Sequence, residues 1–280
     1  MTSHIGFDDI HLEYLSIAEA RQRGGLRLVL GAYTIPGPWR EACKGLFDVK
    51  GLAYACVRTS NADASDLDFG MDDSQSELCA WTAQSSAPVA IWNDERPRAS
   101  WLDQLNLAER LAPAPSLVPH ASAERMQMIG FINEIAGENG FGWSKRLQLI
   151  HAALSTMSAT DEGYTFWKTL ADKYLYTHER GEAAKAKVIE VLTLLAAQLA
   201  AQQQGGRRYL IGSQFSALDI YFSTFYALIE PLPPALCPMA SDYRPAYTNQ
   251  DADIAAAVTP ALAAHRDFIY AEHLVSPIVF

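Results

Sequence analysis

The spacing of apolar residues changes once along this 280-residue chain, and that change limits what it can fold into. Up to about residue 112, short apolar runs alternate with amphipathic stretches, as strands alternate with helices. A proline-rich linker at 113–122 follows, and beyond it apolar residues recur at helical spacing. The sequence therefore predicts a lead-in at 1–25, an α/β domain at 26–112 and an all-helical domain at 123–280. A chain of this length can bury two separate cores.

The first domain begins with the pattern of a βαβ unit. In the lead-in, Ser16 stands three residues before Glu19, which predicts a short capped helix. Next come an apolar run at 26–34, a helical stretch at 38–49 that opens on proline, and a second apolar run at 52–57. Proline is tolerated in a first helical turn because its missing N–H would have no partner there. Strands joined in this way are expected to be parallel, with a right-handed crossover.

The rest of the chain supplies a loop, a hairpin and a series of helices. Residues 59–86 are rich in aspartate and predict a loop with a short helix at 76–82. Residues 88–98 predict a strand and a hairpin turn, and a helix begins after Ser100. Four long periodic segments then predict packed helices at 126–140, 143–157, 163–176 and 182–202.

Charge and residue usage exclude several classes of function. The formal net charge of −10 and the absence of a basic stretch argue against a nucleic-acid partner. No apolar run is long enough to span a membrane, and the first residues do not form a secretory signal, so we expect a cytoplasmic protein. The four cysteines form no CxxC pair, and the seven histidines form no ligand motif. We therefore expect reduced thiols and no metal site.

Four segments, in the right order and at the right distances, resemble the glutathione S-transferase superfamily. The first, PGPWREACKGLFDVKGLAY, carries a helix-starting proline at Pro38. The second is Ala87-Pro88-Val89, at the place of the cis-proline that precedes the family's third strand. The third is Ser100, twelve residues after Pro88. The fourth is the S-x-x-D capping pair Ser216 and Asp219, which we expect to stabilise the fold and not to act in catalysis.

The resemblance implies a thioredoxin-like N-terminal domain that binds glutathione and a helical-bundle C-terminal domain. In the family, the serine matched by Ser100 holds the γ-glutamyl carboxylate, because a helix N-terminus attracts anions. The glutathione-binding residues that it implies here are Gly37, Pro38, Trp39, Ala87, Pro88, Ser100 and Trp101. Family members are mostly homodimers, so the resemblance also implies a homodimer.

Two positions depart from the family pattern. Most members stabilise the glutathione thiolate with Ser, Tyr or Cys just before the helix, where this chain has Gly37. A free thiol has a pKa of about 8.5, so some donor must replace that side chain. Thr34 or the backbone N–H groups of Trp39 and Arg40 are the candidates. The second departure is Ala99, where the family usually has a glutamate that faces the α-amino group of glutathione.

The predicted pocket for a second substrate lies on the first helix of the helical domain. Met128, Phe131 and Ile135 form an apolar stripe on that helix, which serves equally well as ordinary core. The C-terminal segment 265–280 ends on apolar residues that could pack back over the site.

Three functions fit these observations. We favour a glutathione-dependent transferase or lyase that directs a stabilised thiolate at a small hydrophobic electrophile, as detoxification enzymes do. The absence of side-chain donors at Gly37 and Ala99 leaves a non-catalytic glutathione- or ligand-binding protein with the same fold as the alternative. A disulfide-exchange enzyme would need a cysteine at position 37, and the nearest, Cys43, lies more than a helical turn further on.

Overall fold

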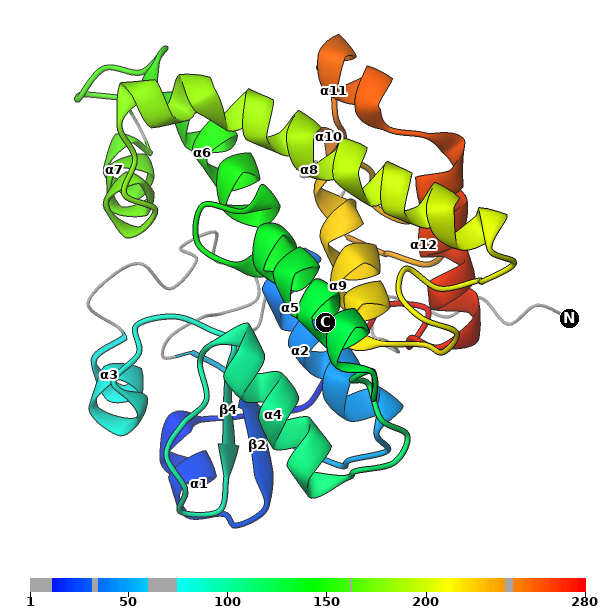
Figure 1. Cartoon of the computed structure of the whole chain (residues 1–280). Coiled ribbons are helices and arrows are strands. Elements are labelled where there is room, and N and C mark those ends of the chain that lie inside the picture. Colours follow the sequence, from blue (N-terminus) through cyan, green and yellow to red (C-terminus); the bar gives the residue numbers. More distant parts are fainter. Residues whose placement is uncertain (1–11, 32–34, 60–74, 162, 240–243) are drawn as a thin grey trace, which may run out of the picture. The chain divides into compact units, whose positions relative to one another are not determined.

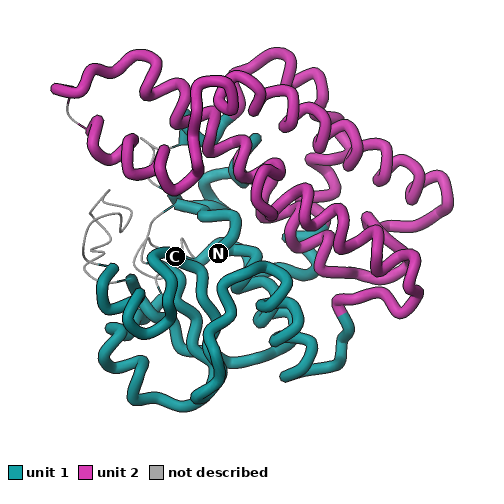
Figure 2. The backbone as a smooth tube through the Cα atoms, turned by 60° about the vertical axis from the view of Figure 1, so that its left-hand side comes forward, with its two compact units in different colours: residues 1–116, 229–248, 269–280 teal, residues 117–228, 249–268 magenta. Residues whose placement is uncertain are grey.

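The computed structural model describes residues 12–31, 35–59, 75–161, 163–239 and 244–280. The chain forms two compact units (Figure 2). Unit 1 comprises residues 1–116, 229–248 and 269–280, and unit 2 comprises residues 117–228 and 249–268. Unit 1 is therefore built from three separate stretches of sequence, of which 229–248 lies between the two stretches of unit 2 and 269–280 follows the second. In the part of the chain that is described, no helix is both long and apolar enough to cross a membrane.

Unit 1 contains a four-stranded mixed sheet with the strand order β1-β3-β2-β4. Its strands are β1 (Tyr14–Leu15), β2 (Leu26–Val29), β3 (Ala55–Val57) and β4 (Val89–Trp92). Strands β2 and β3 are parallel, which confirms the predicted βαβ unit, and β4 runs antiparallel to β2. The sequence did not predict β1, which pairs parallel with β3 and adds an edge strand from the lead-in.

Unit 1 contains five helices among its described residues, of which α1 and α4 begin at capping serines. They are α1 (Ile17–Arg21), α2 (Pro38–Val49), α3 (Ser76–Thr82), α4 (Trp101–Leu111) and the short α10 (Arg244–Tyr247). Helix α1 begins with the predicted capping box of Ser16 and Glu19. Helices α2 and α4 pack against each other near β2 and β4 (Figure 1). The core between α1, α3 and the sheet consists of apolar side chains: Ile17, Ala20, Val29, Val57, Leu78, Val89 and Ile91.

The regular elements of unit 2 are all helical among its described residues, as the spacing of apolar residues predicts. Its elements are α5 (Ser122–Ala136), α6 (Phe141–Leu154), α7 (Tyr164–Lys173), α8 (His178–Gln204), α9 (Ala217–Phe225), the 3₁₀ turn η3 (Tyr226–Leu228) and α11 (Ala252–Ala257). Helix α12 (Pro260–Glu272) begins in unit 2 and ends in unit 1. Helix α6 packs along α8, and α5 packs on α9. The fold class, an α/β part followed by a helical part, is thus confirmed.

A fully buried carboxylate, Asp219, joins three segments of unit 2. One of its oxygens accepts the N–H and the hydroxyl of Ser216, at 3.0 and 3.1 Å. The other accepts the N–H of Leu210 at 2.9 Å and lies 2.9 Å from Nε2 of His265, on α12. A carboxylate can only accept hydrogen bonds, so the histidine donates. The predicted capping pair therefore also fixes the preceding loop and α12.

Replacing Asp219 with alanine leaves several buried donors without an acceptor, and we expect a loss of roughly 3–5 kcal/mol in the free energy of unfolding. Urea denaturation followed by circular dichroism measures it. The matched control is Glu19→Ala, which breaks the same type of capping box at an exposed site and should cost much less. Equal losses in the two variants would show that Asp219 acts only as a helix cap.

Candidate functional site

The N-terminus of α2 presents backbone groups and no capping side chain. Gly37 is the N-cap residue and Pro38 is the first helical residue. The carbonyl of Gly37 accepts the N–H of Glu41 at 2.9 Å, so the helix is closed from its first turn. Proline has no N–H, so the first backbone donors of this turn are the amides of Trp39 and Arg40. Chemically, this end of α2 is a positive pole without a hydroxyl or thiol.

The backbone at Gly37 does not require glycine. Its φ of −72° and ψ of 111° lie in the extended region that any residue adopts. A Cβ atom added there would come no closer than 3.7 Å to another heavy atom, the Cβ of Arg40. The position could therefore hold a serine without strain, although this chain places no side chain there.

The Ala87–Pro88 bond is cis and stands directly before β4, the position that the sequence comparison implied for it. Pro88 is buried and Ala87 is half-buried. The carbonyl of Pro88 accepts a hydrogen bond of 3.2 Å from the side-chain amide of Gln104, on α4. The same amide nitrogen also contacts the carbonyls of Arg98 and Ala99, at 3.3 and 3.4 Å. Gln104 thus fastens the cis-proline turn to the start of α4.

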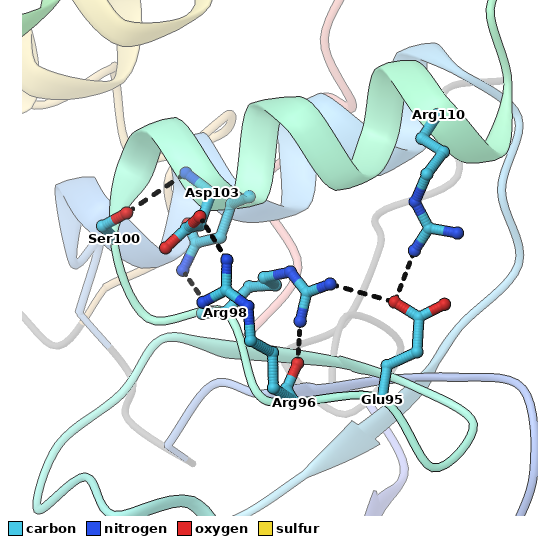
Figure 3. Close-up of polar contacts among 7 residues, drawn as sticks. Glu95, Arg96, Arg98, Ser100, Asp103 and Arg110 are labelled. Atoms are coloured by element: carbon cyan, nitrogen blue, oxygen red, sulfur yellow. Dashed lines mark hydrogen bonds and ion pairs between the residues drawn. The ribbon is translucent and has the colours of Figure 1, made fainter.

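Ser100 is the N-cap residue of α4, as predicted, and it is exposed (Figure 3). Its Oγ accepts the N–H of Asp103 at 3.1 Å, and its carbonyl accepts the N–H of Gln104 at 3.0 Å. A hydroxyl that accepts one bond can still donate its own hydrogen to an anion. Trp101 follows as the first helical residue and is half-buried. This end of α4 combines a helix dipole with an exposed hydroxyl, which suits a carboxylate.

The arginines beside this turn are engaged by acidic side chains (Figure 3). Glu95 accepts from Arg98 at 3.0 Å and from Arg110 at 2.5 Å with the same oxygen. Arg98 also donates to the carbonyl of Arg96. Arg96 pairs with Asp103 at 3.2 Å, but its side chain is 69% exposed, so this pair contributes little to stability. The guanidinium of Arg98 therefore serves the turn itself and is not directed to a ligand.

The remaining predicted residues fall in different places. Thr34 lies outside the described residues. Met128 and Ile135, on α5, are almost completely buried, whereas Phe131 is half-buried. Ile135 lines a small cavity inside unit 2 together with Phe141, Leu192, Leu195, Phe222, Phe225 and Tyr226. Met128 and Ile135 thus behave as core side chains, which leaves Phe131 as the most accessible member of the predicted pocket stripe.

The four cysteines are unpaired, and the thiol nearest the site is inert. Cys43 is fully buried in α2, and burial raises the pKa of its thiol far above the ordinary value. Burial also raises the pKa of Cys56 and of Cys237, each to about 11. A thiol attacks as its thiolate, so these three side chains are unsuited to disulfide exchange. Among the described residues, no three histidine, cysteine or acidic side chains are close enough to hold a metal ion.

Two side chains that matter here, those of Gln104 and Arg40, were not singled out by the sequence pattern. Gln104 and Arg40 are both polar side chains on the buried faces of helices, with exposed fractions of 2% and 4%. For Gln104 the signal was present: a polar residue stands beside Leu105 and Ala108, which define the buried face of its helix. Buried polar groups of this kind are almost always hydrogen-bonded, so they mark points where segments meet.

Comparison with solved structures identifies the fold. The structure is similar to that of a glutathione S-transferase from Methylobacterium radiotolerans in complex with glutathione sulfonate, with 17% identity, a TM-score of 0.55, and coverage of 88% of this chain and 91% of that one. A rice glutathione S-transferase in complex with glutathione gives 18% identity, a TM-score of 0.53, and coverage of 91% and 94%. The β-etherase LigF from Sphingobium gives 16% identity, a TM-score of 0.52, and coverage of 87% of this chain and 99% of that one.

No protein-family model matches the chain, and no curated protein matches its sequence. The likeness is therefore one of structure at low sequence identity. It establishes that this chain has the fold of the glutathione S-transferases.

A substitution of Gln104 tests how the two parts of the site are held together. Gln104→Leu keeps the volume but removes the amide that binds the carbonyl of Pro88, and we expect a loss of about 1–3 kcal/mol in the free energy of unfolding. Thermal denaturation measures it. Asn106→Leu is the control, since it makes the same type of change at an exposed position of the same helix. The two variants should melt at clearly different temperatures, and equal melting temperatures would contradict a joining role for Gln104.

Proposed function

We propose that this protein binds glutathione in unit 1 and uses its thiolate to attack a small hydrophobic electrophile, as a transferase or a lyase. The observation that carries the proposal is the joint presence of two helix N-termini, those of α2 and α4, with the cis-proline turn at Pro88 tied to α4 by Gln104. Two solved proteins of the same fold hold glutathione or glutathione sulfonate. Each feature matches a different part of the glutathione molecule.

In this proposal the γ-glutamyl carboxylate lies at the start of α4. The hydroxyl of Ser100 donates to it, and the dipole of α4 favours its negative charge. The backbone of Ala87, before Pro88, faces the peptide part of glutathione, with Trp39 and Trp101 beside the ligand. Ala99 offers no carboxylate to the α-amino group, and Glu95 is occupied by Arg98 and Arg110.

The cysteinyl sulfur lies at the N-terminus of α2. The amides of Trp39 and Arg40 stabilise the thiolate there, with Thr34 as the candidate for an additional hydroxyl donor. Gly37 contributes no group. Catalysis then depends on thiolate stabilisation and on bringing the electrophile close, with little acid–base chemistry from side chains. Of the predicted stripe of Met128, Phe131 and Ile135, we assign only Phe131 to the electrophile pocket, because the other two are core side chains.

By resemblance we also propose a homodimer in the cytoplasm. Light scattering on the purified protein measures the oligomeric state.

Binding at α4 is tested with Ser100→Asp. Aspartate still caps the helix, but its charge repels a carboxylate, and we expect the dissociation constant of glutathione to rise by about tenfold or more. Calorimetry with glutathione measures it, supported by tryptophan fluorescence. The control is Thr177→Asp, at the N-cap of α8, which adds the same charge at another capped helix. The affinity of Thr177→Asp for glutathione should equal that of the wild-type protein.

Two results would reject this assignment. If the wild-type protein is not saturated by about 10 mM glutathione, its binding free energy is weaker than about 3 kcal/mol. That result would reject glutathione as the ligand. Saturable binding that Ser100→Asp leaves unchanged would reject Ser100 as the carboxylate site.

The second candidate function is binding without turnover, and the observation that favours it is Gly37 itself. At the position that commonly supplies a thiolate donor, this chain has no side chain, although a serine would fit. A protein that only binds or carries glutathione, or another ligand, needs no such donor.

The variant Gly37→Ser separates the two functions. If the thiolate lacks only a donor, the new hydroxyl should raise the rate of conjugation to chlorodinitrobenzene by roughly tenfold or more. Steady-state absorbance assays measure the rate in both proteins. Gly130→Ser, at an exposed helical position with open space around it, is the control. An active wild-type protein that gains nothing from Gly37→Ser would show that the backbone, or Thr34, already suffices.

A further inference from the structure

A cluster of three charged side chains lies almost entirely buried in α2, directly after the glycine–proline turn. Arg40, Glu41 and Lys44 have exposed fractions of 4%, 8% and 6%. Arg40 donates to one oxygen of Glu41 at 2.9 Å, and Lys44 donates to the other at 3.0 Å. Burial by itself would raise the pKa of Glu41, but Lys44 and Arg40 outweigh it and lower that pKa. The carboxylate is therefore ionised and fixes both cations.

Arg40 connects this cluster to the segment that leads into α2. Its guanidinium donates to the carbonyl of Ile35 at 2.6 Å and makes a longer contact of 3.4 Å with the carbonyl of Gly31. These two residues lie at the end of the β2 segment and just before the turn at Gly37. One planar side chain thus holds the backbone on both sides of the approach to α2, a geometry that a guanidinium fork favours.

Val279 and Phe280 contact the two cations of the same cluster. The ring of Phe280 lies against Arg40, with 5.4 Å between the guanidinium carbon and the ring centroid, and it is 2% exposed. Lys44 donates to the carbonyl of Val279. The segment is held in turn by the N–H of Leu12, which donates to the carbonyl of Phe280 at 2.6 Å. A cation held against an aromatic face away from water is attracted to it more strongly than at an exposed site.

We propose that residues 279–280 are positioning residues for the glutathione site: Phe280 acts on Arg40 directly, Val279 acts on it through Lys44 and Glu41, and Arg40 holds the backbone at Gly31 and Ile35. The inference rests on the proposed function, because it assigns to this backbone a role in receiving the thiol. Phe280 and Val279 touch no ligand in this proposal. They keep Arg40 and Lys44 in place, and Arg40 sets the path by which the chain reaches Gly37 and the amides of α2. It also gives a role to the apolar end of the sequence, which packs in unit 1 against α2.

The test compares two alanine substitutions in the same segment. Phe280→Ala removes the ring from Arg40. Ile278→Ala is the matched control, because Ile278 is also 2% exposed. Its N–H donates to the carbonyl of Leu236, and the proposal gives its side chain no role in holding Arg40. Both variants lose a similar apolar side chain from the core of unit 1, so a general loss of stability affects both.

The first readout needs no ligand. Hydrogen–deuterium exchange on peptides that contain Ile35 and Gly37 should be faster in Phe280→Ala than in Ile278→Ala. The second readout is the dissociation constant of glutathione, measured by calorimetry. We expect a rise of about fivefold in Phe280→Ala, from the lost cation–π contact and the looser backbone. In Ile278→Ala the change should stay below about twofold.

Each pattern of results has a definite meaning. Equal exchange in both variants would overturn the proposal, as would faster exchange in Phe280→Ala with an unchanged dissociation constant. If the wild-type protein does not bind glutathione, the proposed function fails, and with it the role in glutathione binding. The exchange data still decide whether Phe280 holds the backbone before α2, so the two failures can be told apart.

Discussion

Burying a charged side chain costs several kcal/mol unless partners surround it, and each unit of this protein contains such a charge where distant segments meet. In unit 2, Asp219 on α9 accepts hydrogen bonds from the loop before it and from His265 on α12. In unit 1, Glu41 pairs with Arg40 and Lys44. Asp219 takes partners from other segments, whereas the partners of Glu41 are its neighbours on α2, and these two cations in turn contact Val279 and Phe280. The need to satisfy a buried charge therefore fixes how late parts of the chain pack against early ones.

The candidate site is built from the backbone poles at the starts of two helices, α2 and α4. Helix α4 begins at an exposed serine that still has a hydrogen to donate, whereas α2 begins with a glycine and a proline. A helix N-terminus with a hydroxyl, as in α4, suits a carboxylate. A helix N-terminus without a capping side chain, as in α2, can favour a thiolate only through its backbone amides and its dipole. In the proposed function, the carboxylate of glutathione therefore gains a side-chain donor at α4, whereas Gly37 supplies none for the thiolate at α2.

Much of this arrangement could be predicted from local patterns. Helix α2 spans the predicted residues because Pro38 fixes its start, and Ser100 caps α4 because its side chain can bond to the N–H of Asp103. The partner of Gln104 could not be predicted in this way. A buried amide shows that a partner exists, but only the folded chain shows that the partner is the carbonyl of Pro88. The lead-in strand β1 was missed because a pair of residues is too short to show the alternation of a strand.

The sequence by itself determined the order of an α/β part and a helical part, the helix starts at Ser16, Pro38, Ser100 and Ser216, and the absence of a donor at Gly37. These features follow from local backbone chemistry, which neighbouring residues are enough to reveal. Only the tertiary structure decided that residues 229–248 and 269–280 return to unit 1. It alone also brought Phe280 against Arg40. Such contacts join residues far apart in the chain, and their energies come from burial and charge pairing, which leave no periodic pattern in the sequence.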